Sequence, residues 1–306
     1  MKLRKYLPVI ILLLSANCCC ASTLSDTTMI KAHLTTITKT KQYRTYDLID
    51  QLNKTADYIK SVFSLYSDSI FIQAYSVNGQ IYKNVICSFG TENKRRIIVG
   101  AHYDVCDSQE GADDNASGIV GLLELSRLLK GRKINQRVDL VAYSLEEPPY
   151  FRTESMGSYI HAKSLVDNKA DVYGMIALEM IGYFKDEQHT QSYPIGLFSL
   201  FYGNRGNYIT LVKKFGAGHF CRDFCRHFLA AKTIRTKKFS GPKALSGIDF
   251  SDHLNYWRFG FSALMVTDTS FFRNKNYHEA SDKMETLDIA RMAKVIDGVL
   301  MTLTTL

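Results

Sequence analysis

The fold is decided by two neighbouring stretches, Ile97-Ile-Val-Gly-Ala-His-Tyr-Asp-Val105 and Gly111-Ala-Asp-Asp-Asn-Ala-Ser-Gly118. The first stretch opens with β-forming apolar residues, which predict a buried strand that delivers His102 and, two residues later, Asp104. The second stretch contributes two further carboxylates just before an apolar segment with helical spacing. A buried strand that ends in histidine and carboxylates is typical of a metal site at the edge of a sheet.

The amino-terminal residues predict export. A basic start, Met1-Lys-Leu-Arg-Lys5, precedes the apolar run Leu7–Leu14, which is too short to span a bilayer as a mature helix. We therefore predict a signal peptide over residues 1–21, one domain over residues 22–306, and a secreted or periplasmic protein. The cysteines at 18–20 also fit lipid attachment, which would make the protein a lipoprotein. No later segment is long and apolar enough to be transmembrane.

Composition is that of an ordinary globular protein, with 306 residues, 46% hydrophobic and 22% charged. The formal net charge is +8 and falls to about +5 without the three basic leader residues. Basic residues are spread along the chain, with one local run at Lys232–Lys238, and this favours a solvated basic surface over nucleic-acid binding. We expect a monomer. The spacing of Cys221 and Cys225 predicts a local disulfide, and Cys87 and Cys106 are expected to be buried thiols.

Strands alternate with helices after residue 95. Long apolar strands in that order favour an α/β fold, with a mostly parallel mixed sheet sandwiched by helices. Strands are expected near residues 70–75, 82–89, 97–101, 138–144, 172–180, 195–201 and 261–267. Helical patterns cover residues 28–66, 115–129, 156–165, 205–230 and 287–305, and residues 232–250 are expected to be rich in loops.

In such sheets the reactive residues collect at the carboxyl ends of the strands. The strand ends and the loops that follow them contribute His102, Asp114, Glu146, Glu147, Glu179, Asp268, Tyr277 and His278. Nitrogen and oxygen donors without thiolates suit zinc, cobalt or manganese. The donors outnumber the needs of one ion, so two ions bridged by one carboxylate account for them better. One of the two adjacent glutamates would then remain free as a base.

Several motifs, taken together and in order, resemble the M28 family of zinc aminopeptidases. The resemblance covers about residues 95–295 and implies the phosphorylase/hydrolase-like α/β sandwich of zinc exopeptidases. The motifs are Ala101-His-Tyr-Asp, Gly111-Ala-Asp-Asp-Asn-Ala-Ser-Gly, Ser144-Leu-Glu-Glu with Met156-Gly-Ser, Leu178-Glu-Met-Ile-Gly-Tyr, Ser251-Asp-His, and Thr267-Asp-Thr with Tyr277-His.

The resemblance implies ligands for two zinc ions. His102 and Glu179 would hold one ion, Glu147 and His278 would hold the other, and Asp114 would bridge them. Many family members carry aspartate at the position of Glu179, and glutamate keeps the carboxylate while adding one methylene.

The resemblance also implies the roles of the remaining site residues. Glu146 matches the general base, and Tyr277 is a candidate donor to the oxyanion of the transition state. Asp104 would accept the second ring N–H of His102 and fix its tautomer. A cis peptide bond is implied between Asp114 and the next residue.

The function implied is a secreted metalloaminopeptidase that acts on peptides with a free amino terminus. Two alternatives stay open: a glutaminyl-peptide cyclotransferase-like enzyme with one zinc, and a non-catalytic binding module on the same fold. Outside the ligand set, Asp113 and Asp282 are expected to cap helices, and Asp252 and His253 to orient the structure. Asp268 could either support the site or cap a turn. The aromatic residues between positions 193 and 208 are expected to belong to the core.

Overall fold

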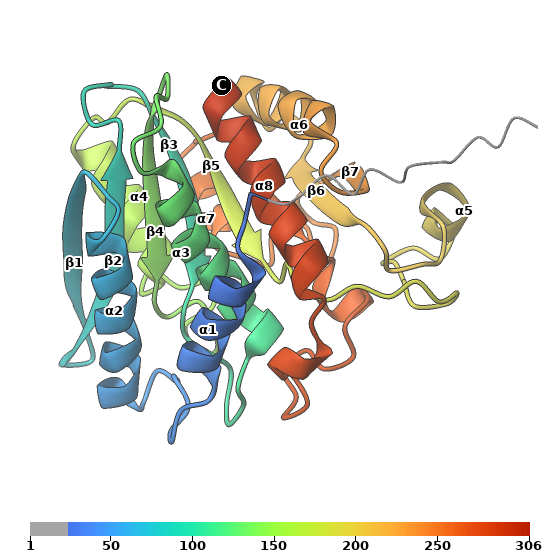
Figure 1. The fold of residues 1–306 in the computed structure, drawn as a ribbon, viewed down its shortest axis with the longest axis horizontal. Coiled ribbons are helices and arrows are strands. Elements are labelled where there is room, and N and C mark those ends of the chain that lie inside the picture. The colour runs from blue at the N-terminus through green and yellow to red at the C-terminus, as the bar shows by residue number, and fades with distance from the viewer. Residues whose placement is uncertain (1–23) are drawn as a thin grey trace, which may run out of the picture.

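The computed structural model describes residues 24–306, which form one mixed sheet with helices on both faces (Figure 1). The strands are β1 (Ser69–Val77), β2 (Gln80–Phe89), β3 (Arg96–His102), β4 (Arg137–Tyr143), β5 (Val172–Glu179), β6 (Ile209–Lys214), β7 (Thr236–Gly241) and β8 (Ala263–Thr267). The α-helices are α1 (Thr27–Thr38), α2 (Ile49–Ser64), α3 (Gly118–Leu129), α4 (Gly157–Asp167), α5 (Phe198–Tyr202), α6 (His219–Ala231), α7 (His253–Arg258) and α8 (Ile289–Thr305). The predicted α/β sandwich is confirmed. The predicted signal peptide lies outside the described residues.

The strand order is β1-β2-β4-β3-β5-β8-β6-β7. Strands β4, β3, β5 and β8 run parallel to one another in the centre, and β6 and β7 are also parallel. The pairs β1–β2, β2–β4 and β6–β8 are antiparallel. The four central strands therefore end side by side at one edge of the sheet, where the predicted site residues lie.

The central strands are apolar on both faces because helices cover both faces. In β3, Ile97 and Val99 belong to the core under α1, α2, α3, α6 and α8, whereas Ile98 belongs to the core under α4 and α7. This double burial explains why the sequence of β3 is a continuous apolar run and does not alternate with polar residues.

The β1–β2 hairpin forms as predicted around Asn78 and Gly79. Both residues have positive φ, 50° and 78°, as a two-residue hairpin turn requires.

Three predicted elements in the second half of the chain are wrong. The segment expected as a strand at 195–201 contains the short helix α5 instead. The expected helix over 205–230 is strand β6 followed by helix α6, and the expected loop at 232–250 contains β7. The β-forming residues of β6, Ile209-Thr-Leu-Val212, are all buried in the sheet. The glycines at 216 and 218 separate that strand from the amphipathic helix that follows.

The cysteines within residues 24–306 are free thiols, so the predicted disulfide between Cys221 and Cys225 is wrong. The Cys221 thiol is turned toward the sheet, where it donates to the Ala263 carbonyl at 3.2 Å and lies 3.3 Å from the Ser262 hydroxyl. Cys87 and Cys106 are buried, as predicted.

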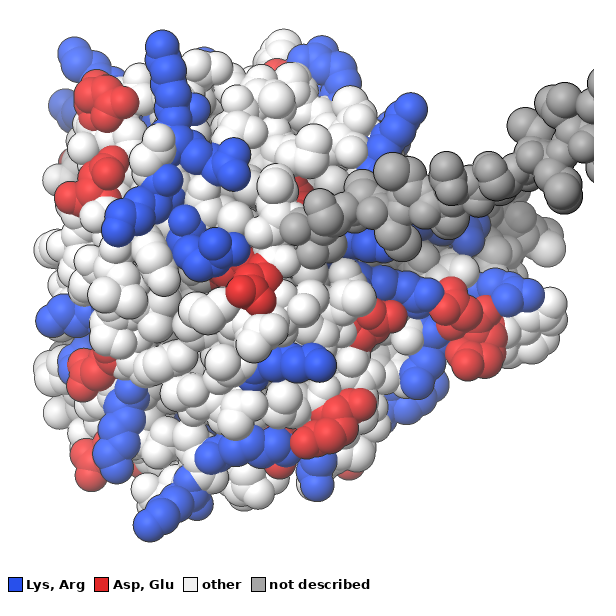
Figure 2. Space-filling model, viewed as in Figure 1, with Lys and Arg blue, Asp and Glu red and all other residues white. Residues whose placement is uncertain are grey.

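The surface carries mixed charge on the face shown in Figure 2, where lysine and arginine side chains are scattered and acidic side chains lie between them. Within the described residues, none of the helices has the length and apolar character needed to cross a membrane.

Candidate metal centre

Six of the predicted site residues meet at the carboxyl edge of the central strands. Strands β3 and β5 each end in one of them, and the loops after β3, β4 and β8 supply the rest. Because these strands are neighbours in the sheet, residues far apart in the sequence become adjacent. The six residues are His102, Asp114, Glu146, Glu147, Glu179 and His278.

The Asp114 carboxylate joins two pairs of residues. Its Oδ1 lies 3.3 Å from His102 Nε2, and its Oδ2 lies 3.3 Å from His278 Nε2. His102 Nε2 also faces Glu179 Oε2 at 3.5 Å, while His278 Nε2 faces Glu147 Oε2 at 3.2 Å. Each histidine thus shares one Asp114 oxygen and has a glutamate of its own, which is the arrangement of two adjacent ion positions with one bridging carboxylate.

The two predicted catalytic residues, Glu146 and Tyr277, lie beside this pair of positions. Glu146 Oε2 is 3.9 Å from His102 Nε2 and approaches the site from the side of that histidine. The Tyr277 ring stacks on the His278 ring with centroids 3.8 Å apart. Both residues line one cavity of about 520 Å³ together with Asp114, Glu147 and other residues, so a substrate in that cavity could contact either side chain.

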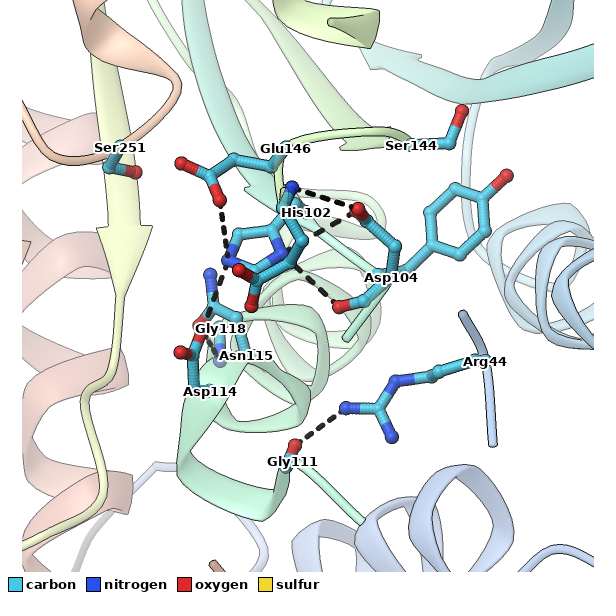
Figure 3. A network of polar contacts seen from close by, with 12 residues as sticks. Arg44, His102, Asp104, Gly111, Asp114, Asn115, Gly118, Ser144, Glu146 and Ser251 are labelled. Carbon is cyan, nitrogen blue, oxygen red and sulfur yellow. Dashed lines mark hydrogen bonds and ion pairs between the residues drawn. The ribbon is translucent and has the colours of Figure 1, made fainter. Parts of the chain in front are cut away.

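Asp104 holds two parts of the site together. His102 Nδ1 donates to the Asp104 backbone carbonyl at 3.3 Å and lies 3.6 Å from its carboxylate, as Figure 3 shows. The other carboxylate oxygen accepts the Glu147 N–H at 3.0 Å. A neutral His102 ring with its proton on Nδ1 would present an unprotonated Nε2 toward Asp114, which is the tautomer that binds a metal.

The turn from Gly111 to Gly118 is shaped to aim Asp114. Gly111 has φ of 54°, and a Cβ there would lie 2.3 Å from the Asp114 carbonyl oxygen. A Cβ on Gly118 would lie 2.6 Å from the Leu178 carbonyl oxygen of β5. Asn115 ties the turn to the same strand, because its side-chain amide donates to the Leu178 carbonyl and to Glu179 Oε2. The Asp114–Asn115 peptide bond is cis, as the resemblance implies.

Comparison with known proteins places this arrangement in a family. The sequence profile of peptidase family M28 matches residues 84–303. The chain belongs to peptidase family M28. The protein named "Uncharacterized protein YfbL" of Escherichia coli K12 is 42% identical over 272 residues, which cover 86% of this M28 chain and 83% of YfbL. A probable leucine aminopeptidase of Trichophyton verrucosum is 28% identical over 228 residues, covering 70% of the M28 chain. That match spans 54% of the leucine aminopeptidase, so the M28 chain spans about half the length of the leucine aminopeptidases it matches.

Solved structures share the fold of this M28 chain. LapB from Legionella pneumophila has a TM-score of 0.72 at 19% identity, with 91% of the M28 chain and 71% of LapB covered. A glutaminyl cyclase from Bacteroides thetaiotaomicron, bound to N-acetylhistamine, has a TM-score of 0.69 at 17% identity, with 93% and 100% covered. At these identities the likeness establishes the zinc-exopeptidase fold and leaves the reaction open.

The M28 site concentrates acidic groups away from water. Burial raises the pKa of Glu146 well above its usual range and that of Glu147 to about 7. Burial opposes the charged form of His278, but the carboxylates of Asp114 and Glu147 raise its pKa to about 10. Burial likewise opposes ionisation of Asp114, yet hydrogen bonding to the two histidines lowers its pKa. The carboxylates of Glu146 and Glu147 are therefore hard to ionise in this buried site, and a bound cation would stabilise their charged forms.

Unpaired buried atoms point to the same conclusion. His102 Nε2, His278 Nε2, Glu147 Oε1 and Asp104 Oδ1 are buried without a hydrogen-bond partner. Polar atoms in such positions are rare in native proteins unless an ion or water satisfies them. The donors are imidazole nitrogens and carboxylate oxygens, which suit zinc and similar divalent ions. The residues of this M28 centre thus fit a metal.

Some residues that shape the site were assigned other roles from the sequence. Asp282, expected to cap the last helix, accepts the backbone N–H groups of Asp113 and Asp114 instead. Asp288 provides the cap of α8. Asp113 does not cap α3, because its carboxylate accepts from the Gly182 N–H and the Asn274 side-chain amide. The side-chain oxygen of Asn115 accepts the Gly118 N–H at the start of α3.

Other supporting residues were not assigned a role, or were left with two. The Ser251 hydroxyl donates to Glu179 Oε2 at 2.8 Å, and its place in the Ser251-Asp-His motif was the available signal. Asp268 caps a turn by accepting the Ser270 N–H and also accepts the Tyr183 N–H. Arg44 is buried beside the Gly111 turn and donates to the carbonyl groups of Glu110 and Gly111 (Figure 3). Nothing in the pattern around Arg44 indicates this contact.

An aromatic cavity of about 670 Å³, partly open to solvent, begins at Glu179 of the M28 centre. The expectation that the aromatic residues at 193–208 belong to the core is confirmed for Tyr208, which is 1% exposed, and is wrong for Tyr193 and Tyr202, which are half-buried. All three tyrosines line this cavity. Its other apolar walls are Val212, Phe239, Ile248, Phe250, Met265, Phe271 and Phe272. The candidate metal centre is therefore adjacent to an apolar cavity, with Glu179 common to both.

Proposed function

We propose that this M28 peptidase is an exported metalloaminopeptidase that uses two divalent ions, with zinc as the expected metal. The observation that carries the proposal is the Asp114 carboxylate, whose two oxygens each face a different histidine at 3.3 Å. His102, Asp114 and Glu179 would hold one ion, and Asp114, Glu147 and His278 the other. When bound, the ions would polarise the scissile carbonyl and lower the pKa of the attacking water.

Glu146 is the residue proposed to move the proton. Its carboxylate lies beside His102 and lines the cavity next to Asp114. Burial raises its pKa, which would help it hold a proton taken from water before passing it to the leaving amine. Tyr277 lines the same cavity and keeps its proton, because burial raises its pKa. Its hydroxyl can therefore donate a hydrogen bond to the oxyanion that develops on the substrate carbonyl.

The apolar cavity supports a preference for peptides with a large apolar amino-terminal residue. It begins at Glu179, so the side chain of a substrate residue bound at the ions would enter it. Walls of tyrosine, phenylalanine and aliphatic side chains favour burial of apolar surface. The leucine aminopeptidases among the relatives are named for such a substrate residue.

The test is a panel of aminoacyl fluorogenic peptides assayed with the metal-loaded protein, after chelation and after zinc is added back. We expect hydrolysis of apolar aminoacyl substrates, loss of activity on chelation, recovery with zinc, and two ions per chain by elemental analysis. One ion per chain, with pyroglutamate formed from amino-terminal glutamine, would contradict the proposal and favour the cyclotransferase. Absence of activity on every substrate would favour a binding module.

Replacement of Glu146 by glutamine tests the assigned base. Glutamine has nearly the same shape but cannot take a proton, so kcat should fall by about 100-fold or more while the metal content stays at two ions. Glu92→Gln, at an exposed position between β2 and β3, is the matched control and should keep full activity. A loss of less than tenfold in Glu146→Gln would exclude Glu146 as the base.

A further inference from the structure

A thiol lies beside one of the two ion positions. Cys106 follows β3 in the loop before the Gly111 turn and is only 8% exposed. Its Sγ, a Glu147 carboxylate oxygen and a His278 ring nitrogen all lie within 4.8 Å of one another. A second group, of His102, Asp114 and Glu147, meets the same limit.

The groups around the Cys106 thiol have unfilled bonding capacity. Glu147, 4% exposed, has its Oε1 buried without a hydrogen-bond partner, and His278 Nε2 is also without one. The thiol itself has a weak contact to Asp107 Oδ2 at 3.7 Å. By comparison, the Cys221 thiol is held by a carbonyl and a hydroxyl at 3.2 and 3.3 Å. Cys106 is therefore not committed to a strong partner elsewhere.

We propose that Cys106 is a further metal ligand, binding as a thiolate to the ion position of Glu147 and His278. The proposal rests on the two-ion centre proposed above. On binding, a sulfur–metal bond forms, the S–H bond breaks and the proton leaves to water. With the Asp114 bridge, that position then has four protein donors, the number found in closed tetrahedral zinc sites.

A closed position on one side makes the two halves of the centre unequal. The position of His102, Asp114 and Glu179 has three protein donors, which is the number that leaves room for water in catalytic zinc sites. Glu146 Oε2 lies on that same side, 3.9 Å from His102 Nε2. Glu146 would then lie beside the ion position that has room for water. The ion position of Cys106 would serve to anchor the second ion. A soft thiolate donor also favours zinc or cobalt over manganese or magnesium at that position.

Stepwise loading with cobalt tests the proposal in the wild-type protein, Cys106→Ser and Cys106→Ala. Cobalt bound to thiolate gives a charge-transfer band in the near ultraviolet, which nitrogen and oxygen ligands do not give. We expect the band in the wild type at two cobalt ions per chain and its loss in both variants. Cys87→Ala, which removes a buried thiol of β2, is the control and should keep the band. The dissociation constant of the affected zinc ion should rise at least about tenfold in Cys106→Ser.

X-ray absorption of the zinc-loaded wild type keeps the test independent of whether the variants fold. One sulfur scatterer at about 2.3 Å for every two zinc ions is expected. Two bound ions without the sulfur scatterer or the charge-transfer band would overturn the ligand role of Cys106 and leave the proposed function intact. Retention of the band in Cys106→Ser would also overturn the ligand role. Fewer than two bound ions would overturn the two-ion function, and with it this proposal.

Discussion

Asp282 shows how one side chain can set a site without contacting the reacting atoms. Its carboxylate is fully buried and accepts the backbone N–H groups of Asp113 and Asp114 at 3.0 Å. These bonds fix the turn that aims the bridging carboxylate. We therefore expect the Asp282 carboxylate to affect the position of the Asp114 carboxylate more than the overall stability of the protein.

Replacement of Asp282 by asparagine should weaken both stability and metal binding. The amide nitrogen would face a backbone N–H, leaving a buried donor without an acceptor at a cost of about 1–3 kcal/mol in the free energy of unfolding. Chemical denaturation and zinc titration measure the two effects. Asp288→Asn, which alters the cap of α8, is the control: it should cost about 1 kcal/mol or less and leave zinc affinity unchanged. Equal zinc affinity in both variants would refute the role given to Asp282.

At the scale of elements, the first half of the chain was predictable and much of the second half was not. Strands β3, β4 and β5 are buried on both faces and end at, or shortly before, candidate site residues, so their apolar runs and the residues that follow indicated both the sheet and the site. Strands β6 and β7 lie at the far edge of the sheet, where short mixed segments carry little periodic signal. The motifs predicted the six residues of the candidate metal centre. The roles of Arg44 and Asp282 were not predicted, because they depend on contacts that form only in the folded chain.

The segments between β5 and β6 and around α7 and β8 build the aromatic cavity, and they should set substrate preference. Phe250 lines both this cavity and the one beside Glu146. Phe250→Ala should lower kcat/KM for a leucyl substrate by about 10- to 200-fold, because apolar contact with the substrate side chain is lost. The fall for an alanyl substrate should be much smaller.

Phe215→Ala is the control for that variant, since Phe215 is 65% exposed on the loop after β6. This variant should leave kcat/KM unchanged for both the leucyl and the alanyl substrate. An equal loss for leucyl and alanyl substrates in Phe250→Ala would show that the cavity does not hold the amino-terminal side chain.

At the scale of the whole molecule, two buried histidines tie stability to pH. Burial lowers the pKa of His161 in α4 and of His253 in α7 to about 4. The His161 ring shares a 2.6 Å hydrogen bond with the Tyr256 hydroxyl. Among charged groups near His161, Asp139 raises its pKa while Arg96 and Arg137 lower it. Each histidine stays neutral in the folded protein at pH values where the unfolded chain takes up a proton.

The contribution of these two histidines to stability should therefore be fully present above pH 6.5 and should be lost as the pH drops from 6.5 toward 4. Each histidine contributes a slope of up to about 1.4 kcal/mol per pH unit in the free energy of unfolding. His161→Phe removes one titrating group at similar size, so its stability should depend less steeply on pH than that of the wild type. Urea unfolding at several pH values measures the difference, and parallel curves for the two proteins would contradict the prediction.

The two edge strands of the sheet, β1 and β7, differ in sequence character. Strand β7 closes one border and carries adjacent lysines, Lys237 and Lys238, whose charge discourages pairing with another strand. Strand β1 forms the other border over nine residues, Ser69–Val77, without a charged residue or a proline, and Phe71 on it is 60% exposed. Its free backbone groups are open to any extended chain. Aggregation of this protein at high concentration should therefore start at β1, and a single lysine introduced there should suppress it.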